Sequence, residues 1–142
     1  MDAHHTKDKG DLAVAKAHAD LASKGYIVLF PTTEHAPFDV VAYRDNAFWR
    51  VQVKYRSARG GVIEVDFRSG WTDRHGVHKR PLDKSAVDVF CVYSPDTDEC
   101  YYVRPSDHGQ SVNLRIAPSR NGQALGVRHA SRFRSMPPVI PT

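Results

Sequence analysis

The sequence is poor in cysteine and contains no long apolar run. Only two of its 142 residues are cysteines, and their spacing does not fit a zinc site, which argues against a metal- or disulfide-stapled fold. No stretch has the length and apolarity of a membrane helix, and no secretory signal pattern occurs. A Walker-type phosphate loop and a readable Ser/His/Asp triad are also missing. We therefore expect a soluble, cytoplasmic protein with reduced cysteines and no membrane partner.

The composition fits one globular domain with an anionic partner. Hydrophobic residues make up 41% and charged residues 25% of the chain, which is ordinary for a globular protein. The length predicts a single domain over residues 1–142, with residues 1–8 and 136–142 as loose tails. The formal net charge of +4 favours a nucleic acid as partner.

Two runs rich in β-branched and aromatic residues, 37–43 and 48–54, predict a β-hairpin. Asp45-Asn46 lies between them and tolerates the left-handed backbone of a tight turn. With that turn, one face of the hairpin is apolar and carries the opposed pairs Phe38–Val53, Val40–Val51 and Ala42–Trp49.

The other face of the hairpin gathers three polar side chains. Asp39 is expected opposite Gln52, and Lys54 follows two residues further along the same strand. Directly opposed Cβ atoms lie roughly 4.5–5.5 Å apart. A shift of one residue would move all three groups to the apolar face, so the hydrophobic pattern fixes this register. Taken alone, these residues also fit a solvated face of a hairpin.

The motif Pro37-Phe38-Asp39, followed by Gln52-Val53-Lys54, resembles the active site of the PD-(D/E)XK nuclease superfamily. Gln52 departs from the commonest pattern, which has an acid there, and is similar to a smaller branch that includes homing endonucleases encoded in bacterial introns. Three further segments are similar to that branch: Lys9-Gly10-Asp11, Gly25-Tyr26 and 87–93. The likeness spans about residues 7–130. The resemblance implies a restriction-endonuclease-like α/β fold, a mixed β-sheet flanked by helices.

The resemblance also implies a chemistry for these residues. Asp39 would be the main ligand of Mg²⁺, for which Mn²⁺ would substitute, and the Gln52 amide oxygen and the Val53 backbone carbonyl would complete the protein ligands. Mg²⁺ keeps several waters, so few protein ligands suffice. Lys54 would orient the attacking water or stabilise the negative charge that develops at the phosphate.

A helix is expected over residues 11–24, and its acid is the least certain part of the site. The resemblance places the usual helix acid at Val14, which cannot bind a metal. Asp11 lies three residues earlier on the same helix face, and we expect it to take over that role. A plain helix cap at Asp11 explains the residue equally well. Glu34 is a weaker candidate.

The remaining strands complete a sheet of four or five strands, covered by a second helical or irregular layer. The run 26–30 predicts a strand buried on both faces. An alternating pattern predicts a strand over 62–67, where Glu64 and Asp66 share one face, which fits either a solvated face or a second carboxylate pair. Further strands are expected over 87–93, with Asp88 as a turn or edge carboxylate, and over 100–103 and 111–116.

Basic residues follow the hairpin in an expected exposed loop over residues 68–84. We predict DNA contacts from this loop and from the segment before it: Arg56, Arg59, Arg68, Arg74, His78, Lys79 and Arg80. A second basic cluster, which suits either DNA or an oligomer contact, comprises Arg115, Arg120, Arg128, Arg132 and Arg134.

Together these features predict a Mg²⁺-dependent endonuclease for double-stranded DNA, sequence-specific in the manner of homing or restriction enzymes. Cutting both strands needs two active sites, so a homodimer or homotetramer is expected. Two rival functions stay open: a nuclease that resolves Holliday junctions, and a catalytically weakened nucleic-acid-binding module of the same fold.

Overall fold

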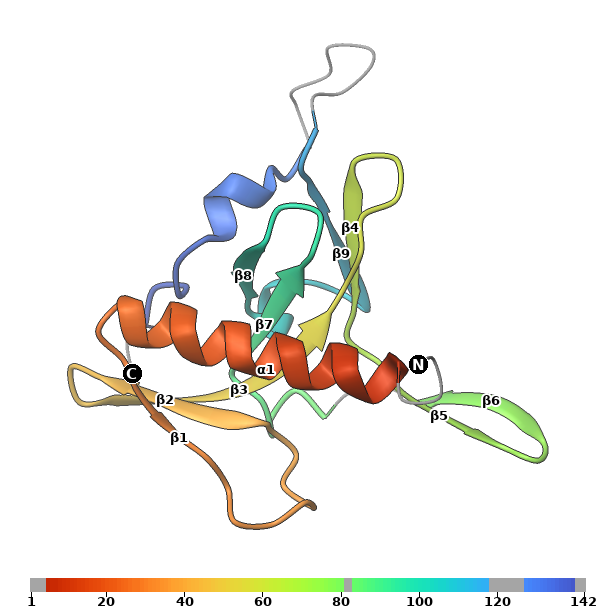
Figure 1. The fold of residues 1–142 in the computed structure, drawn as a ribbon, viewed down its shortest axis with the longest axis horizontal. Coiled ribbons are helices and arrows are strands. Elements are labelled where there is room, and N and C mark those ends of the chain that lie inside the picture. The colour runs from red at the N-terminus through yellow and green to blue at the C-terminus, as the bar shows by residue number, and fades with distance from the viewer. Residues whose placement is uncertain (1–4, 81–82, 118–126, 140–142) are drawn as a thin grey trace.

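A computed structural model describes residues 5–80, 83–117 and 127–139 of the chain. One α-helix, short 3-10 helices and nine strands are assigned in these residues (Figure 1). In chain order they are α1 (His5–Ser23), β1 (Ile27–Leu29), β2 (Val40–Arg44), β3 (Ala47–Tyr55), β4 (Val62–Asp66), β5 (Ser69–Asp73), β6 (Gly76–Arg80), β7 (Val89–Ser94), β8 (Glu99–Val103), η2 (Pro105–Asp107), β9 (Ser111–Arg115) and η3 (Ala130–Phe133).

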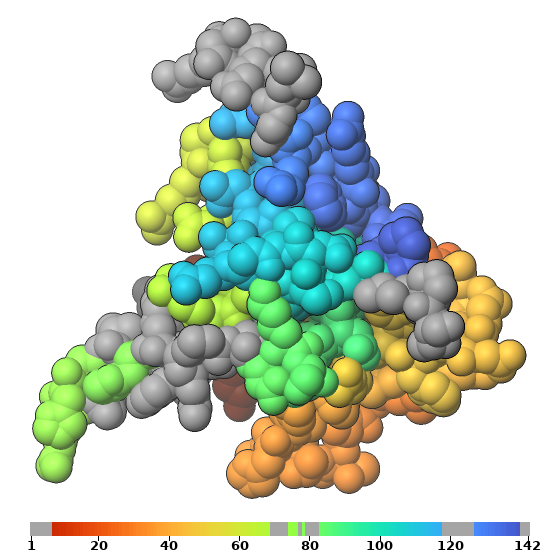
Figure 2. All heavy atoms as spheres, turned by 180° about the vertical axis from the view of Figure 1, so that it is seen from behind, coloured from red at the N-terminus to blue at the C-terminus, as the bar shows by residue number. Residues whose placement is uncertain are grey.

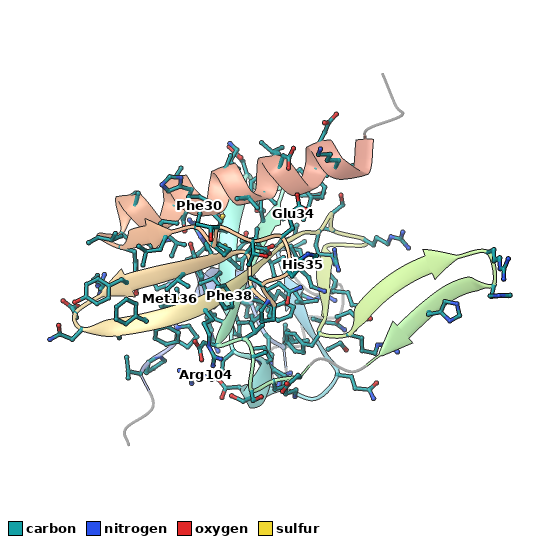
Figure 3. The ribbon with its side chains drawn as sticks, turned by 90° about the horizontal axis from the view of Figure 1, so that it is seen from below. Phe30, Glu34, His35, Phe38, Arg104 and Met136 are labelled. Atoms are coloured by element: carbon teal, nitrogen blue, oxygen red, sulfur yellow. The ribbon has the colours of Figure 1, made fainter. Side chains whose placement is uncertain are left out.

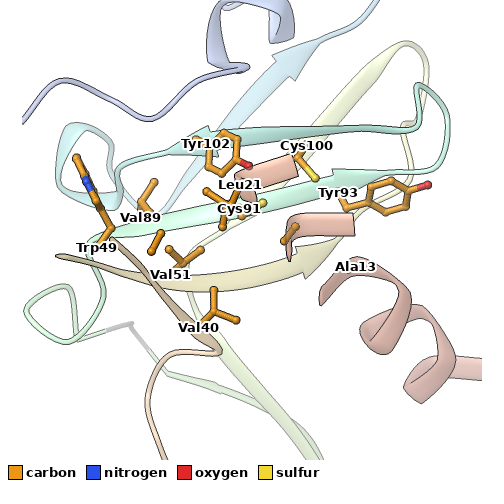
Figure 4. Packing of buried hydrophobic residues seen from close by; sticks show 12 residues of the cluster. Ala13, Leu21, Val40, Trp49, Val51, Val89, Cys91, Tyr93, Cys100 and Tyr102 are labelled. Carbon is orange, nitrogen blue, oxygen red and sulfur yellow. The ribbon is translucent and has the colours of Figure 1, made fainter. Parts of the chain in front are cut away.

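The central sheet has five strands in the order β1-β2-β3-β7-β8 (Figure 1). β3 and β7 pair in parallel and the other neighbours pair antiparallel, so the sheet is mixed, as predicted. α1 crosses one face of this sheet. The small side chains of Ala13 and Ala17 allow a close approach, and Leu21 fills the space beside them (Figure 4). The α/β fold class predicted from the sequence is therefore confirmed.

The β2–β3 hairpin turns at Asp45 and Asn46, which have φ angles of 53° and 63°. Two consecutive positive φ angles define the type I′ turn whose twist matches a hairpin. The predicted pairs Val40–Val51 and Ala42–Trp49 are present. All four of these side chains are buried against α1, so the predicted apolar face is confirmed at these pairs.

The opposite face of the sheet is only partly covered. The antiparallel pair β4–β9 packs over β7 and β8, where Phe90, Val92 and Tyr101 join a second core with Ile63 and Leu114. This second layer is a β-ribbon, whereas the sequence had suggested a helical or irregular layer. Over β1 and β2 the described residues form no such layer, whereas β4 reaches the end of β3, where the Lys54 ammonium donates to the Asp66 carbonyl oxygen.

Two predicted elements have different limits or surroundings. The helix begins at His5 and not at Asp11, because the polar lead-in continues the helical hydrogen bonding. The strand after it was expected to be buried on both faces, which is wrong. β1 is the edge of the sheet, and Ile27 and Leu29 are 60% and 44% exposed.

Residues 68–84 are not the loop that the sequence suggested. β5 and β6 form a hairpin that turns at Arg74 and His75, and Gly76, with a φ of 113°, begins β6. The hairpin extends away from the rest of the molecule (Figures 1 and 2). Glycines and a proline had indicated a loop, but Arg74-His75 is the two-residue turn of a hairpin, and Gly76 supplies a positive φ directly after it.

The chain ends and the cysteines complete the comparison. Cys91 and Cys100 are free and buried, as expected. Met136, the first residue of the predicted C-terminal tail, packs against the core. Arg120 lies outside the described residues. Among the described helices, none combines the length and apolarity needed to cross a membrane.

Candidate active site

Asp39 occupies the point where β2 separates from β3. The last residue pair of the hairpin ladder is Val40–Val51, so the predicted pairs Phe38–Val53 and Asp39–Gln52 are not part of it. The Asp39 N–H donates to the Val51 carbonyl at 2.9 Å. The Asp39 carboxylate accepts a hydrogen bond of 2.7 Å from the Val53 N–H. The Asp39 side chain thus takes the place of a backbone partner for the Val53 N–H, and this hydrogen bond fixes the carboxylate.

The surroundings of the Asp39 carboxylate suit a bound cation. The residue is exposed overall. Even so, burial around the carboxyl group raises the pKa of Asp39, while the hydrogen bond from Val53 and the charge of Lys54 act in the opposite direction. The Val53 N–H that holds the Asp39 carboxylate is adjacent in sequence to Lys54.

Gln52 and Lys54 project from the face of β3 that α1 does not cover. Val51 and Val53 belong to the core beneath α1, and neighbouring residues of a strand point to opposite faces. The Lys54 ammonium donates to the Asp66 carbonyl oxygen at 2.7 Å and lies 5.1 Å from the centre of the Phe90 ring. Gln52 is half-buried, and its amide makes no hydrogen bond within the described residues.

The Val53 carbonyl points to the same edge of β3 as the Val53 N–H, because both groups of one strand residue share an edge. That edge carries the Asp39 carboxylate. The site therefore offers one carboxylate, one backbone carbonyl and one amide oxygen, an all-oxygen donor set that suits Mg²⁺ with several waters retained. The described residues contain no group of three or more His, Cys, Asp or Glu that could hold a metal ion.

Asp11 does not cap the helix, since it lies in the interior of α1. It is exposed and shares one side of the helix with Val14 and His18, at spacings of three and seven residues. The His18 ring contacts Phe30 edge-on at 5.3 Å, and Phe30 begins the segment that leads to Asp39. Asp11 is thus on the side of α1 that faces this segment.

Glu34 lies in the same segment, between β1 and β2, beside His35 (Figure 3). Both residues are exposed. No contact joins Glu34 to Asp39 among the described residues, so the structure adds nothing to its weak candidacy.

The predicted DNA-contacting residues divide into two groups. Arg56 and Arg59 follow β3 and border a large hollow beside β4. Arg68 is held by Asp66, whose carboxylate accepts from the Arg68 Nε at 3.1 Å and Nη2 at 2.8 Å. This ion pair also raises the pKa of Arg68, chiefly through the hydrogen bond.

The other predicted contacts lie on the projecting β5–β6 hairpin. Arg74 is exposed at the turn, where its Nε lies 3.3 Å from the His75 Nε2. In the backbone register His78 is opposite Trp71, while Lys79 and Arg80 end β6. Four of the predicted DNA contacts therefore lie on this one hairpin: Arg74, His78, Lys79 and Arg80.

Two site features could not be read from residue types. The Asp66 carbonyl and the Phe90 ring hold Lys54, whereas the sequence had drawn attention only to the Asp66 carboxylate, on a solvated face or paired with Glu64. A backbone carbonyl carries no signal in the sequence. Asp88 is a structural carboxylate: it accepts from the Arg50 N–H, Nε and Nη2 at 2.7, 3.0 and 2.9 Å, and this arginine lowers the pKa of Asp88.

An aspartate at a strand end, with an amide and a lysine on the neighbouring strand of a mixed sheet, is the arrangement that the nuclease resemblance implies for this chain. The chain matches the family model of the PD-(D/E)XK endonucleases over residues 4–136, and it belongs to that family. The resemblance seen in the sequence is thereby confirmed.

The fold has a counterpart among solved structures. A bacterial homing endonuclease, I-Ssp6803I, superposes with a TM-score of 0.72 and 24% sequence identity, over 91% of this chain and 88% of that chain. At this identity the likeness establishes the fold. No curated protein matches the sequence.

Proposed function

We propose that this PD-(D/E)XK endonuclease hydrolyses phosphodiester bonds of double-stranded DNA in a reaction that depends on a divalent metal, Mg²⁺ or Mn²⁺. The observation that carries the proposal is that the Asp39 carboxylate is held at 2.7 Å by the Val53 N–H, one residue from Lys54. The Lys54 ammonium is itself fixed by the Asp66 carbonyl oxygen at 2.7 Å. A fixed cation beside a carboxylate at an open sheet face suits an anionic substrate.

In the proposed site each group has a separate task. Asp39, the Gln52 amide oxygen and the Val53 carbonyl would hold the ion, and Asp11 would add a carboxylate from α1. A bound Mg²⁺ supplies Lewis-acid chemistry at the phosphoryl oxygens and at the attacking water.

Lys54 keeps its ammonium in place through the Asp66 carbonyl, so little reorganisation is needed as negative charge develops on the phosphate. Gln52 is neutral where most relatives in the superfamily carry an acid. The site therefore holds less negative charge and depends more on Asp39.

The proposal extends to the target and the assembly. Cleavage of both strands requires two active sites, so we propose a homodimer or homotetramer acting on a symmetric, specific sequence. The fold similarity to a homing endonuclease supports this direction. The basic residues of the β5–β6 hairpin, Arg74, His78, Lys79 and Arg80, and the residues Arg56, Arg59 and Arg68 would contact the DNA.

Cleavage of supercoiled plasmid in Mg²⁺ or Mn²⁺ tests the proposal. Asp39→Asn and Lys54→Ala should abolish nicking and linearisation, whereas Asp45→Asn should not. Asp45 is an exposed turn residue with a φ of 53°, a conformation that asparagine also adopts. A four-way junction is included as substrate, because preferential cutting of the junction would identify a resolving nuclease instead.

A non-catalytic binding module is the second candidate. It is favoured by Val14, which stands where the resemblance places the helix acid, and by the lack of a three-ligand cluster in the described residues. Asp11→Asn distinguishes the two functions. A nuclease that uses Asp11 loses metal affinity in this variant, measured by calorimetric titration with Mn²⁺. A protein that binds DNA but never cleaves it supports the module.

A further inference from the structure

Two hollows join on the outer face of the β4–β9 ribbon. The larger has a volume of about 770 Å³ and extends from α1 and the end of β3 to β4. The smaller, of about 340 Å³, continues along β9. Val62 and Asn113 border both hollows, so the two adjoin, and together we call them the β4–β9 groove. Five cations border it: Lys9, Arg56, Arg59, Arg115 and Arg128.

The strand pattern explains why polar groups line this groove. In β9, Val112 and Leu114 are buried in the second core, so alternation turns Asn113 and Arg115 outward. Glu64 and Asp66 of β4 lie outward for the same reason, with Asn113 opposite Glu64 in the register. The outer face is thus a polar surface built by two regular strands.

The groove cations differ from most other arginines of the chain. None of the five forms an ion pair with a carboxylate within the described residues. Lys9 instead lies 5.5 Å from the Tyr55 ring centre, and Arg56 donates to the Tyr55 carbonyl. Elsewhere carboxylates hold the guanidinium groups, in the pairs Arg44–Asp45, Arg50–Asp88, Arg68–Asp66, Arg104–Asp107 and Arg134–Glu99.

Two carboxylates border the groove and do not cancel its charge. Asp66 is neutralised by Arg68 at 2.8 Å. Glu64 is exposed and forms no ion pair within the described residues. The groove therefore keeps an excess of positive charge, and a hollow concentrates the field of the charges that border it.

The groove also adjoins the candidate active site. Asp66 borders the larger hollow, and its carbonyl oxygen holds the Lys54 ammonium at 2.7 Å. A polyanion bound along the groove would therefore pass within one residue of the catalytic lysine.

We infer that the β4–β9 groove binds the sugar–phosphate backbone of duplex DNA beyond the scissile phosphate, with Arg115 and Arg128 at its far end. The inference rests on the proposed nuclease function and adds the path of the DNA to it. Guanidinium groups bind phosphate oxygens in a forked geometry. Such contacts set the position of the duplex and carry no sequence information of their own.

The test is the double variant Arg115→Ala/Arg128→Ala, with duplex DNA binding measured by fluorescence anisotropy in buffer with a chelator. Loss of two phosphate contacts should make the slope of log affinity against log salt less negative by about 1.8, and affinity near 0.1 M salt should fall about 10-fold or more. The double lysine variant, Arg115→Lys/Arg128→Lys, keeps the charges and should restore most of the slope.

Arg132→Ala is the matched control. Arg132 is exposed on η3, forms no ion pair in the described chain and borders neither hollow. If the double alanine variant, folded by its melting temperature, binds with the salt slope of the wild type or of Arg132→Ala, the inference is wrong. Wild-type protein that binds DNA with the expected slopes but cuts nothing would instead overturn the proposed function and leave the groove in place.

Discussion

The strongest test of the proposed chemistry is the replacement of Lys54 by methionine. Methionine has nearly the length of lysine and can keep the contact with the Phe90 ring, since a thioether packs well against aromatic rings. The change removes the ammonium and its hydrogen bond to Asp66. A single positioned donor of this kind contributes about 2.7–4 kcal/mol to transition-state stabilisation, so cleavage should slow by about 10²–10³.

The same substitution should move the pH dependence of cleavage. Burial raises the pKa of Asp39, and the charge of Lys54 partly opposes that rise. Without the charge the pKa of Asp39 rises further, so the carboxylate takes a proton at a higher pH. The acid limb of the rate profile should therefore shift to higher pH in Lys54→Met.

The assay is single-turnover cleavage of a labelled duplex at saturating enzyme and Mg²⁺, over a range of pH. Lys7→Met, on the exposed surface of α1, is the control for loss of one positive charge. Unfolding by denaturant should show a change of no more than about 1.5 kcal/mol, the worth of one hydrogen bond. A folded Lys54→Met that cuts within about tenfold of the wild type, or keeps the same acid limb, refutes this role of the lysine.

Three further predictions concern stability. Asp39→Asn should raise the melting temperature at neutral pH, because a carboxyl whose pKa is raised in the fold is destabilising when ionised; the gain should vanish at pH values low enough to protonate Asp39. Asp88→Asn should lower the free energy of unfolding by about 1–2 kcal/mol at neutral pH, since the half-exposed ion pair of Asp88 with Arg50 is bidentate. The difference in unfolding free energy should shrink as the pH falls through the lowered pKa of Asp88. Gly61→Ala should destabilise by about 1–3 kcal/mol, because φ is 76° and the new Cβ would lie 2.8 Å from the Ala117 Cβ; Gly10→Ala, in α1 with open space around it, is the control. Chemical denaturation, followed at several pH values for the two aspartates, checks all three.

The hairpin was predictable because local chemistry determines it. A pair of residues that tolerates positive φ sets the turn, and the alternation of apolar residues sets the register. Both were read from the sequence, and Val40–Val51 and Ala42–Trp49 followed. The approach of Asp39 to the Val53 N–H was not predictable, because the paired part of β2 begins at Val40, one residue after the aspartate.

Long-range neighbours explain the other differences. An apolar run such as 26–30 looks the same in a central and in an edge strand, and only the order of strands decides between them. The anchor of Lys54 is a backbone carbonyl from β4, which no residue type announces. Glycine and proline residues led to the prediction of a loop over residues 68–84. The pairing of β5 with β6 depends instead on the two-residue turn Arg74-His75.

The parallel pairing of β3 with β7 has a consequence for how the enzyme matures. β7 begins roughly thirty residues after β3 ends, and contacts so distant along the chain form late, because closing a long loop costs entropy. A nascent chain that stops before β7 lacks the ring beneath Lys54 and half the support of β3. The capacity to cut DNA should therefore arise only after β7 has been synthesised. An incomplete nascent chain would not yet be an active nuclease.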